Sequence, residues 1–514
     1  MKSAAPRTSS GKILQNSFWY GLEQILELVI FLSTSIVVAR AFGPAKLGYF
    51  GYINLFVSVI TTTGGSGLAT ATRKYMSEFI ATERLGLARS VYRFTYRYQL
   101  LGATVIALVG VLGIWLFGEP QFRWMSTLLV LSIVPGVMSW VPAQANVAFE
   151  DLSKNTISAL GYLGSYAVVI VLTLHFHWDL AGIAAATLVG RSVEMVMRTI
   201  PLHAKLRTLG EEPLPQEIAA RIRRFCLQAM GIQLLMAVVW NRSELIFLRR
   251  YSTLEQMGFY SVATGLATKL LLVPKTFGGA TGVTLMVECS RDPDRVESIV
   301  KNASRYLLLV AIPVHLGAAA LTGQAIRFAY TDKYAGAIPA LIVASLLSLP
   351  LAFQEIPETL LRAADRQKLL FRWLIITGIL NMLLDWILIP RYAAVGAAWG
   401  NGLSQAFGLV AIWLQAQGAY RFSLPKRAAS RLLAAGLGMA GVAFLISRNL
   451  AGLPGLVAAV LAAIPCYILL VKLLHGLEPS DRARLLPIGR RLPGAIGGAY
   501  AAIIGFVVPG GVTE

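Results

Sequence analysis

Fourteen long apolar runs divide the sequence, and they constrain its fold more than any other feature. A helix needs about 20 consecutive apolar residues to cross the hydrocarbon core of a bilayer. The 514-residue chain is 56% hydrophobic and only 14% charged, whereas soluble domains carry about 25% charged residues. We therefore expect an all-α polytopic membrane protein, with helices at residues 17–38, 46–68, 95–116, 124–147, 156–174, 179–200, 225–247, 258–286, 303–323, 337–361, 369–389, 393–416, 429–447 and 453–474.

The basic residues are distributed unevenly between the two sides that these spans define. We place the N-terminus inside and count residues at span ends with the adjoining connection. The even-numbered connections and both termini then hold 32 of the 46 Lys and Arg, and the odd-numbered connections hold 9. Cytoplasmic loops carry such an excess, which predicts cytoplasmic N- and C-termini. The net charge of +20 is explained by these loops and indicates no nucleic-acid partner.

A stretch near the N-terminus recurs in weaker form in the second half of the chain. Six helices per copy is an even number, so the second copy enters the membrane from the same side as the first. This predicts two parallel six-helix repeats that form two lobes, plus two extra C-terminal helices. The matching positions, 210 or 214 residues apart, are Arg40 with Arg250, 47–50 with 257–260, Gly64 and Gly65 with Gly278 and Gly279, Asp151 with Asp365, Lys154 with Lys368, and Gly182 with Gly396.

The duplication and the composition together predict five segments. They are an N-terminal lobe (1–204), a cytoplasmic linker (205–224), a C-terminal lobe (225–428), helices 13 and 14 (429–474) and a basic tail (475–514). The tail ends in a short, Gly-rich apolar stretch, which we expect to lie at the interface or on the bundle; a fifteenth span is the alternative.

The segment ARAFGPAKLGYFGY, followed by a Gly-rich helix end and the basic TRKYMSE, carries a family resemblance. It resembles Wzx-type polysaccharide flippases of the multidrug/oligosaccharidyl-lipid/polysaccharide (MOP) exporter superfamily, whose usual opening is similar to R-x-x-G-P-x-x-x-G-x-[YF]. The resemblance implies translocation of an undecaprenyl-diphosphate-linked oligosaccharide across the bacterial inner membrane for cell-surface polysaccharide biosynthesis. It also implies alternating access, coupling to H⁺ or Na⁺, and a polysaccharide polymerase as a partner. Lipid II flippases and multidrug antiporters are relatives that the resemblance leaves open.

Charged residues inside apolar spans are the first candidates for function, because burying a charge in a membrane is costly. The sixth span carries Arg191, Glu194 and Arg198 on one helix face, with Arg191 near mid-membrane. A guanidinium suits a diphosphate, so we expect Arg191 to bind substrate. The alternative is an Arg191–Glu194 ion pair that only holds helices together.

Two lysines of the eighth span and one arginine of the seventh complete the expected substrate-binding set. Lys269 has no acidic neighbour within one turn, so it requires a partner on another helix or an anionic substrate. Lys275 follows Pro274, and this proline predicts a local helix break, which a membrane tolerates only where the backbone is buried or lines a cavity. For Arg242, snorkelling to the interface is the alternative to substrate binding.

Three carboxylates are candidates for ion coupling. Glu23 and Glu27 lie four residues apart on one helix face, where they repel unless one is protonated or both find cations. Asp385 lies near the outer end of the eleventh span. The alternative for each is pairing with Lys or Arg of another helix; Glu355, Glu358 and His315 are weaker candidates of the same kind.

Several kinds of chemistry have no support in the sequence. No Gly-rich phosphate loop with a Lys-Ser/Thr ending is encoded, so we expect no ATP site, and we expect no other cofactor or metal. A membrane glycan polymerase would need a sizeable outer loop, but the longest expected one, 324–336, is short. The main alternative to a flippase is an ion-coupled small-molecule or drug antiporter of the same fold, whose cavity Glu23, Glu27 and Asp385 would make acidic.

Overall fold

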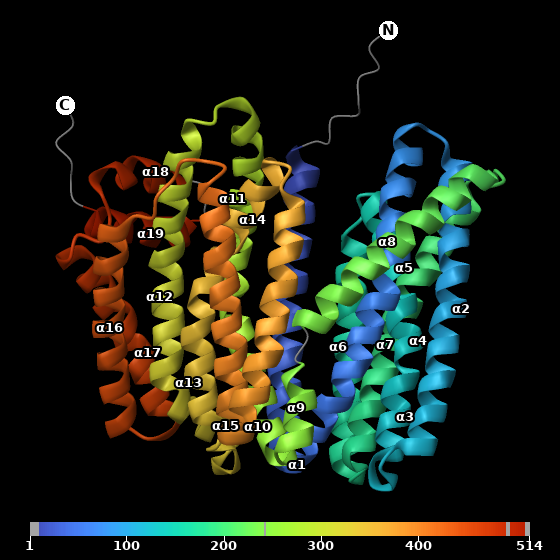
Figure 1. The fold of residues 1–514 in the computed structure, drawn as a ribbon, viewed down its shortest axis with the longest axis horizontal. Helices are drawn as coiled ribbons and strands as arrows, with labels where there is room; N and C mark the ends of the chain where they lie inside the picture. Colours follow the sequence, from blue (N-terminus) through green and yellow to red (C-terminus); the bar gives the residue numbers. More distant parts are fainter. Residues whose placement is uncertain (1–9, 241–242, 490–493, 509–514) are drawn as a thin grey trace. The chain divides into compact units, whose positions relative to one another are not determined.

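The computed structural model describes residues 10–240, 243–489 and 494–508. Nearly all of these residues are helical, and none of them lies in a strand. The chain divides into two compact units, Met1–Ile246 and Phe247–Glu514, and each is a bundle of long helices (Figure 1). The predicted all-α polytopic class is confirmed.

The first unit contains eight α-helices and one short 3₁₀ helix, within its described residues. They are α1 (Ser10–Ala81), α2 (Leu85–Phe117), η1 (Pro120–Phe122), α3 (Arg123–Leu131), α4 (Ile133–Met138), α5 (Trp140–Ala148), α6 (Ser153–Phe176), α7 (Asp179–Arg207) and α8 (Gln216–Trp240).

Helix α9 (Glu244–Tyr251) crosses the boundary, and the remaining elements form the second unit. They are α10 (Leu254–Leu270), α11 (Leu272–Arg291), α12 (Arg295–Tyr330), η2 (Asp332–Tyr334), α13 (Ala337–Ser348), η3 (Leu349–Phe353), α14 (Glu355–Ala363), α15 (Gln367–Gln417), α16 (Lys426–Asn449), α17 (Gly452–Leu473), α18 (Pro479–Gly489) and α19 (Gly494–Val507).

Two of the longest helices are each a pair of spans joined at a sharp corner. In α1 the corner is Gly43, whose φ of 76° and ψ of 175° are non-helical, followed by Pro44. Glycine accepts this backbone without strain, and proline has no N–H to continue the helix. In α15 the corner is Ala393, with φ 47° and ψ −124°. Gly43 and Pro44 therefore separate the first two spans within α1.

The span count agrees with the sequence within the described residues. Ten helices are long and apolar enough to cross a membrane, or eleven if the bent pair α10 and α11 is one span. Because α1 and α15 each contain a corner, they account for two spans each, which raises the number to thirteen. The remaining predicted span, 225–247, falls on α8 and α9 and is interrupted by 241–242, which lie outside the described part.

The 214-residue offset of the sequence repeat recurs in the helix boundaries. Helix α3 begins at Arg123 and α13 begins 214 residues later at Ala337. Likewise α6 begins at Ser153 and α15 at Gln367. A residue with positive φ begins the sixth span of each copy. In the first copy it is Asp179, with a φ of 54°, and in the second copy it is Ala393, 214 residues later, with a φ of 47°.

The fourth span of each copy is broken into short pieces by prolines. In the first unit Pro135 and Pro142 lie in the α3–α4–α5 segment, and in the second Pro350 and Pro357 lie in the α13–η3–α14 segment. A proline inside a helix removes one hydrogen bond and crowds the preceding turn. Both broken spans are substantially buried in their bundles.

Helix α8 packs in the first unit, which differs from the sequence-based division at residue 225. At the contact with α1, a Cβ added to Gly67 would lie 2.8 Å from the carbonyl oxygen of Cys226. The absent side chain at Gly67 therefore lets the two backbones approach closely. The boundary between the compact units follows Ile246 instead.

The linker between the copies is held at one end of the first unit. Glu212 pairs with Arg84 at 2.7 Å, and Glu211 pairs with both Arg89 and Arg93. The backbone oxygen of Leu209 also accepts a hydrogen bond from Arg89 at 2.8 Å. The linker is thus fixed to the start of α2.

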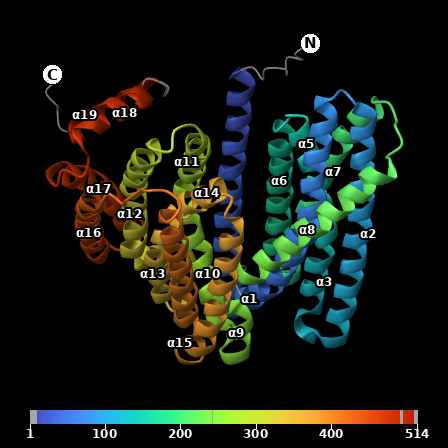
Figure 2. The same cartoon turned by 45° about the horizontal axis from the view of Figure 1, so that its top comes forward.

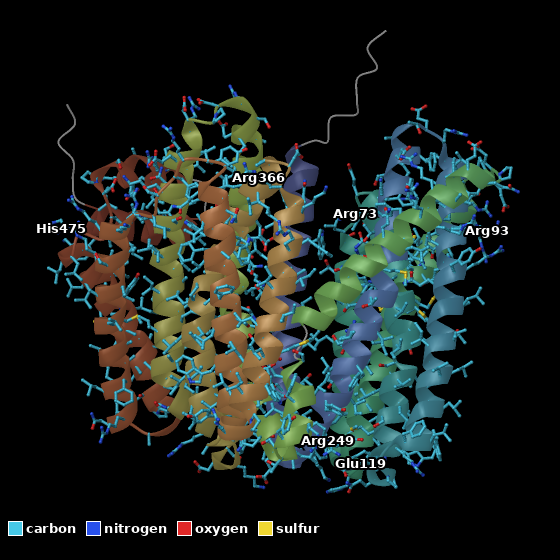
Figure 3. All side chains as sticks on the ribbon, viewed as in Figure 1. Arg73, Arg93, Glu119, Arg249, Arg366 and His475 are labelled. Atoms are coloured by element: carbon cyan, nitrogen blue, oxygen red, sulfur yellow. The ribbon has the colours of Figure 1, made fainter. Side chains whose placement is uncertain are left out.

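Charged groups separate to the two ends of each unit as the predicted topology requires. In the first unit Arg73 and Arg93, from the second connection, lie toward one end, and Glu119, from the third, lies at the other (Figure 3). In the second unit Arg366 and His475 lie toward one end and Arg249 lies at the other. Even and odd connections therefore occupy opposite ends within each unit.

The tail forms α18 and α19 at the end of the second bundle (Figure 2). Helix α19 has 14 residues, which gives a length of about 21 Å at 1.5 Å per residue. This is shorter than the roughly 30 Å hydrocarbon core, and α19 packs on α17 through the cluster that contains Ile504 and Val507.

Candidate functional site

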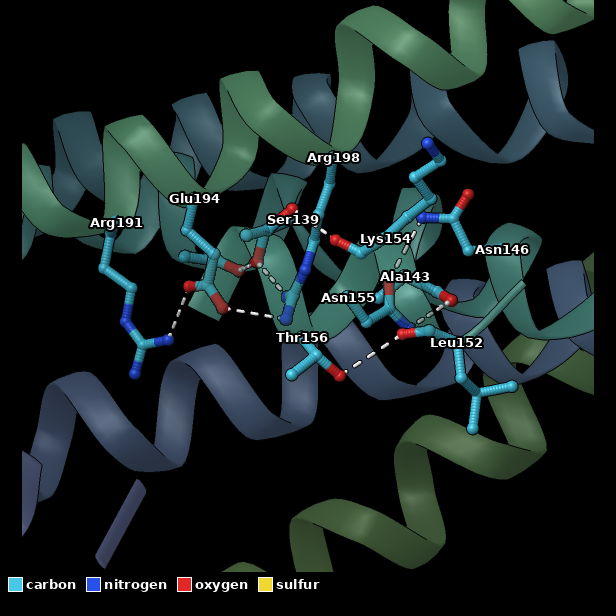
Figure 4. Close-up of polar contacts among 12 residues, drawn as sticks. Ser139, Ala143, Asn146, Leu152, Lys154, Asn155, Thr156, Arg191, Glu194 and Arg198 are labelled. Atoms are coloured by element: carbon cyan, nitrogen blue, oxygen red, sulfur yellow. Dashed lines mark hydrogen bonds and ion pairs between the residues drawn. The ribbon is translucent and has the colours of Figure 1, made fainter. Parts of the chain in front are cut away.

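The clearest intramembrane charge cluster lies on α7 in the first unit (Figure 4). Glu194 accepts from two arginines: Arg191 Nη1 lies 2.9 Å from Oε2, and Arg198 Nη2 lies 2.9 Å from Oε1. Arg198 also donates to Ser139 Oγ at 3.4 Å. These three charged residues, at i, i+3 and i+7 of one helix, are the predicted face.

The three side chains of this cluster differ in the fraction of their surface that is exposed. The side chains of Glu194 and Arg198 are 7% and 10% exposed, whereas that of Arg191 is 42% exposed. Within these three residues, two guanidiniums share the one carboxylate of Glu194. The ion pair expected as the alternative is present, and the binding role of Arg191 stays a prediction.

Arg191 has neighbours on helices α6 and α4. Its guanidinium carbon lies 4.9 Å from the centre of the Tyr162 ring on α6, a cation–π contact. A Cβ added to Gly136 on α4 would lie 4.0 Å from Arg191 Cδ and 3.5 Å from Thr61 Cγ2 on α1. The glycine therefore leaves room for the arginine stem beside α1.

In the second unit, Lys269 and Lys275 lie on opposite sides of a helix bend. Helices α10 and α11 meet at Leu271 with a bend of 42°. Pro274 lacks the N–H that would bond to the carbonyl of residue 270, so the helix breaks there. The predicted break of this span is confirmed; Lys269 is half-buried and Lys275 is exposed.

Lys275 has acidic neighbours on α14 that local sequence spacing did not reveal. It interacts electrostatically with Glu358, which also accepts hydrogen bonds from Gln354 at 2.6 Å and from Arg362. A Cβ on Gly278 would lie 3.1 Å from the Glu355 Cβ, so α11 and α14 are in contact here. Lys275 thus belongs to a mixed-charge cluster.

The candidate coupling residue Asp385 is fully buried within α15. Asn381 Nδ2 donates to its Oδ2 at 3.3 Å, and Ser404 Oγ donates to Asn381 at 2.9 Å. A Cβ on Gly400 would lie 2.7 Å from Asp385 Oδ1, so the second half of α15 approaches the carboxylate closely. Its role in ion coupling stays a prediction.

Three of the expected site residues cannot be placed. Arg242 and the side chains of Glu23 and Glu27 lie outside the described residues. Within the described part of the chain, no group of three or more His, Cys, Asp and Glu is arranged to hold a metal ion.

A buried ionic cluster that sequence analysis did not identify joins α12 to α18. Arg305 Nη2 lies 2.6 Å from Asp481 Oδ1, and its Nη1 lies 2.6 Å from Glu478 Oε1. Tyr306 also donates to Asp481 at 2.7 Å. The hydrogen bond from Arg305 lowers the pKa of the Glu478 carboxyl below its ordinary value. No local spacing reveals this cluster, because Arg305 and Asp481 lie 176 residues apart.

The apolar spans, with charged residues buried among them, define a polytopic membrane protein. The fold is similar to that of the lipid II flippase MurJ in an inward closed conformation, at 15% identity and a TM-score of 0.69, covering 90% of this chain and 98% of that one. It is also similar to an inward-facing multidrug resistance MATE transporter of the MOP superfamily, at 14% identity and a TM-score of 0.65, covering 76% and 94%.

Residues 37–339 match the profile of a family described as polysaccharide biosynthesis protein, and the chain belongs to this family. An uncharacterized membrane protein of Methanocaldococcus jannaschii is 20% identical over 433 residues, which are 78% of this chain and 83% of the relative. The expected resemblance to polysaccharide flippases of the MOP superfamily is therefore confirmed for family and fold.

Proposed function

We propose that this protein is a flippase that moves an undecaprenyl-diphosphate-linked oligosaccharide across the bacterial cytoplasmic membrane for cell-surface polysaccharide biosynthesis. The family supports a role in polysaccharide biosynthesis. The fold shared with a lipid II flippase supports transport of a lipid-linked sugar. The observation that carries the proposal is the cluster of Arg191, Glu194 and Arg198 inside an apolar helix, in which the guanidinium of Arg191 is partly exposed.

The physical requirement for such a protein is the passage of a polar headgroup through hydrocarbon. Transfer of unpaired charges and hydroxyls from water into an apolar medium is strongly unfavourable. A cationic, hydrated surface within the bundle lowers this barrier while the polyprenyl tail stays in the bilayer. Arg191 is the group that receives the diphosphate, because its guanidinium is partly exposed and matches phosphate geometry.

The other expected binding residues supply additional positive charge along the path. Lys269 and Lys275 flank the 42° bend between α10 and α11, and Arg242 follows α8. A broken helix has backbone groups that are satisfied only in a buried or hydrated setting. The bend is therefore a place where the helix moves during alternating access.

Ion coupling and orientation complete the proposal. Glu23, Glu27 and Asp385 bind the coupling ion, H⁺ or Na⁺, and both termini are cytoplasmic. The charge asymmetry of the loops supports this orientation. A polysaccharide polymerase on the outer side receives the transported unit.

A second candidate is an ion-coupled drug antiporter. The shared fold with a MATE transporter and the buried carboxylate of Asp385 favour it. A cationic drug requires an acidic surface, however, and the most exposed charged side chain of the α7 cluster is the guanidinium of Arg191. We therefore prefer the flippase.

The test is the pool of lipid-linked oligosaccharide in cells that lack the protein. Lipids are extracted and analysed by mass spectrometry, and the leaflet is assigned by exposure to a periplasmic glycosidase. We expect a diphosphate-linked glycan to accumulate on the cytoplasmic side. Restoring the wild-type gene should clear it, whereas the Arg191→Ala gene should not.

An unchanged pool together with altered sensitivity to cationic drugs contradicts the flippase and favours the antiporter. Protein abundance in the membrane is measured for each strain. An Arg191→Ala protein that is present at wild-type level and clears the pool contradicts the binding role of Arg191.

A further inference from the structure

A cavity of about 300 Å³ lies between α1, α2, α4 and α8, entirely within the first unit. Its wall is mainly apolar and includes Leu68, Ile106, Val137, Leu227 and Met230. This volume is at the lower end of the roughly 300–1,000 Å³ typical of small-molecule sites. We call this space, defined by its lining from Gly64 to Met230, the α2 cavity.

Two glycines keep the α2 cavity open. A Cβ added to Gly102 on α2 would meet no atom within 4 Å. A Cβ added to Gly64 on α1 would meet only Ile106 Cδ1, at 3.9 Å. Larger residues at these positions would therefore occupy the cavity rather than collide with its walls.

The α2 cavity is elongated along the helices and open at the side. Its lining on α2 runs from Phe94 to Ile106, a rise of about 18 Å at 1.5 Å per residue. Tyr98 and Leu227, which also line it, are 47% and 71% exposed. Exposed apolar side chains on a transmembrane bundle face lipid, so the cavity opens to the hydrocarbon.

One end of the α2 cavity is cationic. Arg223 lines it and precedes Cys226, Leu227 and Met230 on α8, so it lies toward the end where the linker is fixed. Arg221 nearby pairs with Glu78. Arg223 is exposed and makes no hydrogen bond or ion pair with any other residue in the described part of the chain.

We propose that the α2 cavity binds one acyl chain of an anionic bilayer phospholipid, with the phosphate on the Arg223 guanidinium. The slot is long and apolar, opens to lipid, and ends in a cation on the side of the second connection. A phospholipid places its phosphate and its chain in this order along the membrane normal. A soluble anion has no apolar chain to fill the slot, and an uncharged lipid has no anionic group to bind Arg223. The bound chain fills the space between α8 and α2 and supports the packing of α8 in the first unit.

The test is lipid binding by the purified full-length protein, measured by native mass spectrometry with phosphatidylglycerol and phosphatidylcholine of identical acyl chains. We expect phosphatidylglycerol to bind about tenfold more tightly, because the quaternary ammonium of phosphatidylcholine offsets the charge of its phosphate at Arg223. Arg223→Gln should remove this preference. The matched control is Arg224→Gln, since Arg224 is also exposed but does not line the cavity.

The apolar half of the proposal is tested by filling the cavity. Gly102→Leu should weaken binding of both lipids to a similar extent, and Gly102→Ala should do so less. Gly113→Leu is the matched control on the same helix, because a Cβ there also meets no atom within 4 Å but lies outside the cavity. Gly102→Ala keeps the test valid if Gly102→Leu does not fold.

Four results would overturn the proposal. Equal binding of the two lipids by the wild-type protein rejects the preference for an anionic headgroup. Equal effects of Arg223→Gln and Arg224→Gln reject the contact with Arg223. Wild-type binding by both Gly102 variants rejects the acyl chain. Undecaprenyl phosphate at an equimolar concentration is tested as a competitor of phosphatidylglycerol. If it displaces phosphatidylglycerol from the wild-type protein and this displacement is lost in Gly102→Leu, the cavity is assigned to the polyprenyl tail instead.

Discussion

Arg305 and Asp481 are both fully buried, and the guanidinium of Arg305 donates to Asp481 Oδ1 at 2.6 Å. The pair joins α12 to α18, which lies outside the predicted spans. The second oxygen of Asp481 accepts from the backbone N–H of Glu478 at 2.8 Å. The basic tail is therefore anchored to the second bundle by a buried ion pair and the hydrogen bonds around it.

The first prediction concerns this anchor. Asp481→Ala leaves the Arg305 charge buried with less compensation, and breaking such a pair costs about 3–5 kcal/mol. We expect a marked fall in the midpoint of thermal denaturation in detergent. Asp292→Ala is the control, because Asp292 forms an exposed ion pair with Arg295. The side chains of Asp292 and Arg295 are 41% and 67% exposed, and such a surface pair contributes about 0–1 kcal/mol to stability. Equal effects of the two substitutions would contradict the anchor.

The second prediction is a pH dependence from Glu478. Its pKa is lower in the folded protein than the ordinary value of 4.5, because Arg305 donates a hydrogen bond to the carboxylate. Its stabilising contribution is therefore complete above the unfolded-state pKa and is lost as pH falls through the folded-state pKa. Denaturation midpoints of wild type and Glu478→Gln should differ at pH 7 and converge below the ordinary pKa. A difference that is constant down to pH 3 would argue against this hydrogen bond.

The third prediction separates two members of the α7 cluster. Glu194→Gln removes the carboxylate that two guanidiniums share, and Arg198 is only 10% exposed, so this variant should lose much of its thermal stability. Arg191→Gln leaves the buried Glu194–Arg198 pair intact and removes a partly exposed charge. It should keep near-wild-type stability and lose transport. The reverse order of stabilities would show that Arg191 is the structural member.

The fourth prediction concerns the corner of α15. Ala393 has a φ of 47° and ψ of −124°, a conformation that glycine adopts at less cost than alanine. Ala393→Gly should therefore raise stability by about 0.5–1 kcal/mol, seen as a higher denaturation midpoint. Ala394→Gly, at a buried helical neighbour, should lower it. A loss of stability at both positions would contradict strain at Ala393.

The sequence predicts local features of this protein well. Gly43 and Pro44 determine the first corner by their own backbone chemistry, and Pro274 determines the break between α10 and α11. The Arg191–Glu194 pair follows from a spacing of three residues on one helix. In each case the cause and the effect lie within one or two helix turns.

Features that depend on distant partners were not predicted. The pairing of Arg305 with Asp481 depends on how α18 folds back, which apolar composition does not encode. The packing of α8 on α1 depends on the close approach at Gly67, which the composition of the two spans does not reveal. Lys275 likewise comes within electrostatic range of Glu358 only through the contact of α11 with α14.

The most direct test of the central claim is flipping by the purified protein in proteoliposomes. A fluorescent undecaprenyl-diphosphate oligosaccharide is placed in both leaflets, and its exposure to an impermeant quencher is followed over time. We predict that wild-type protein exposes the inner pool rapidly and that Arg191→Gln does not, at equal protein content. Exposure no faster than in protein-free vesicles, across either direction of an H⁺ or Na⁺ gradient, would contradict the flippase.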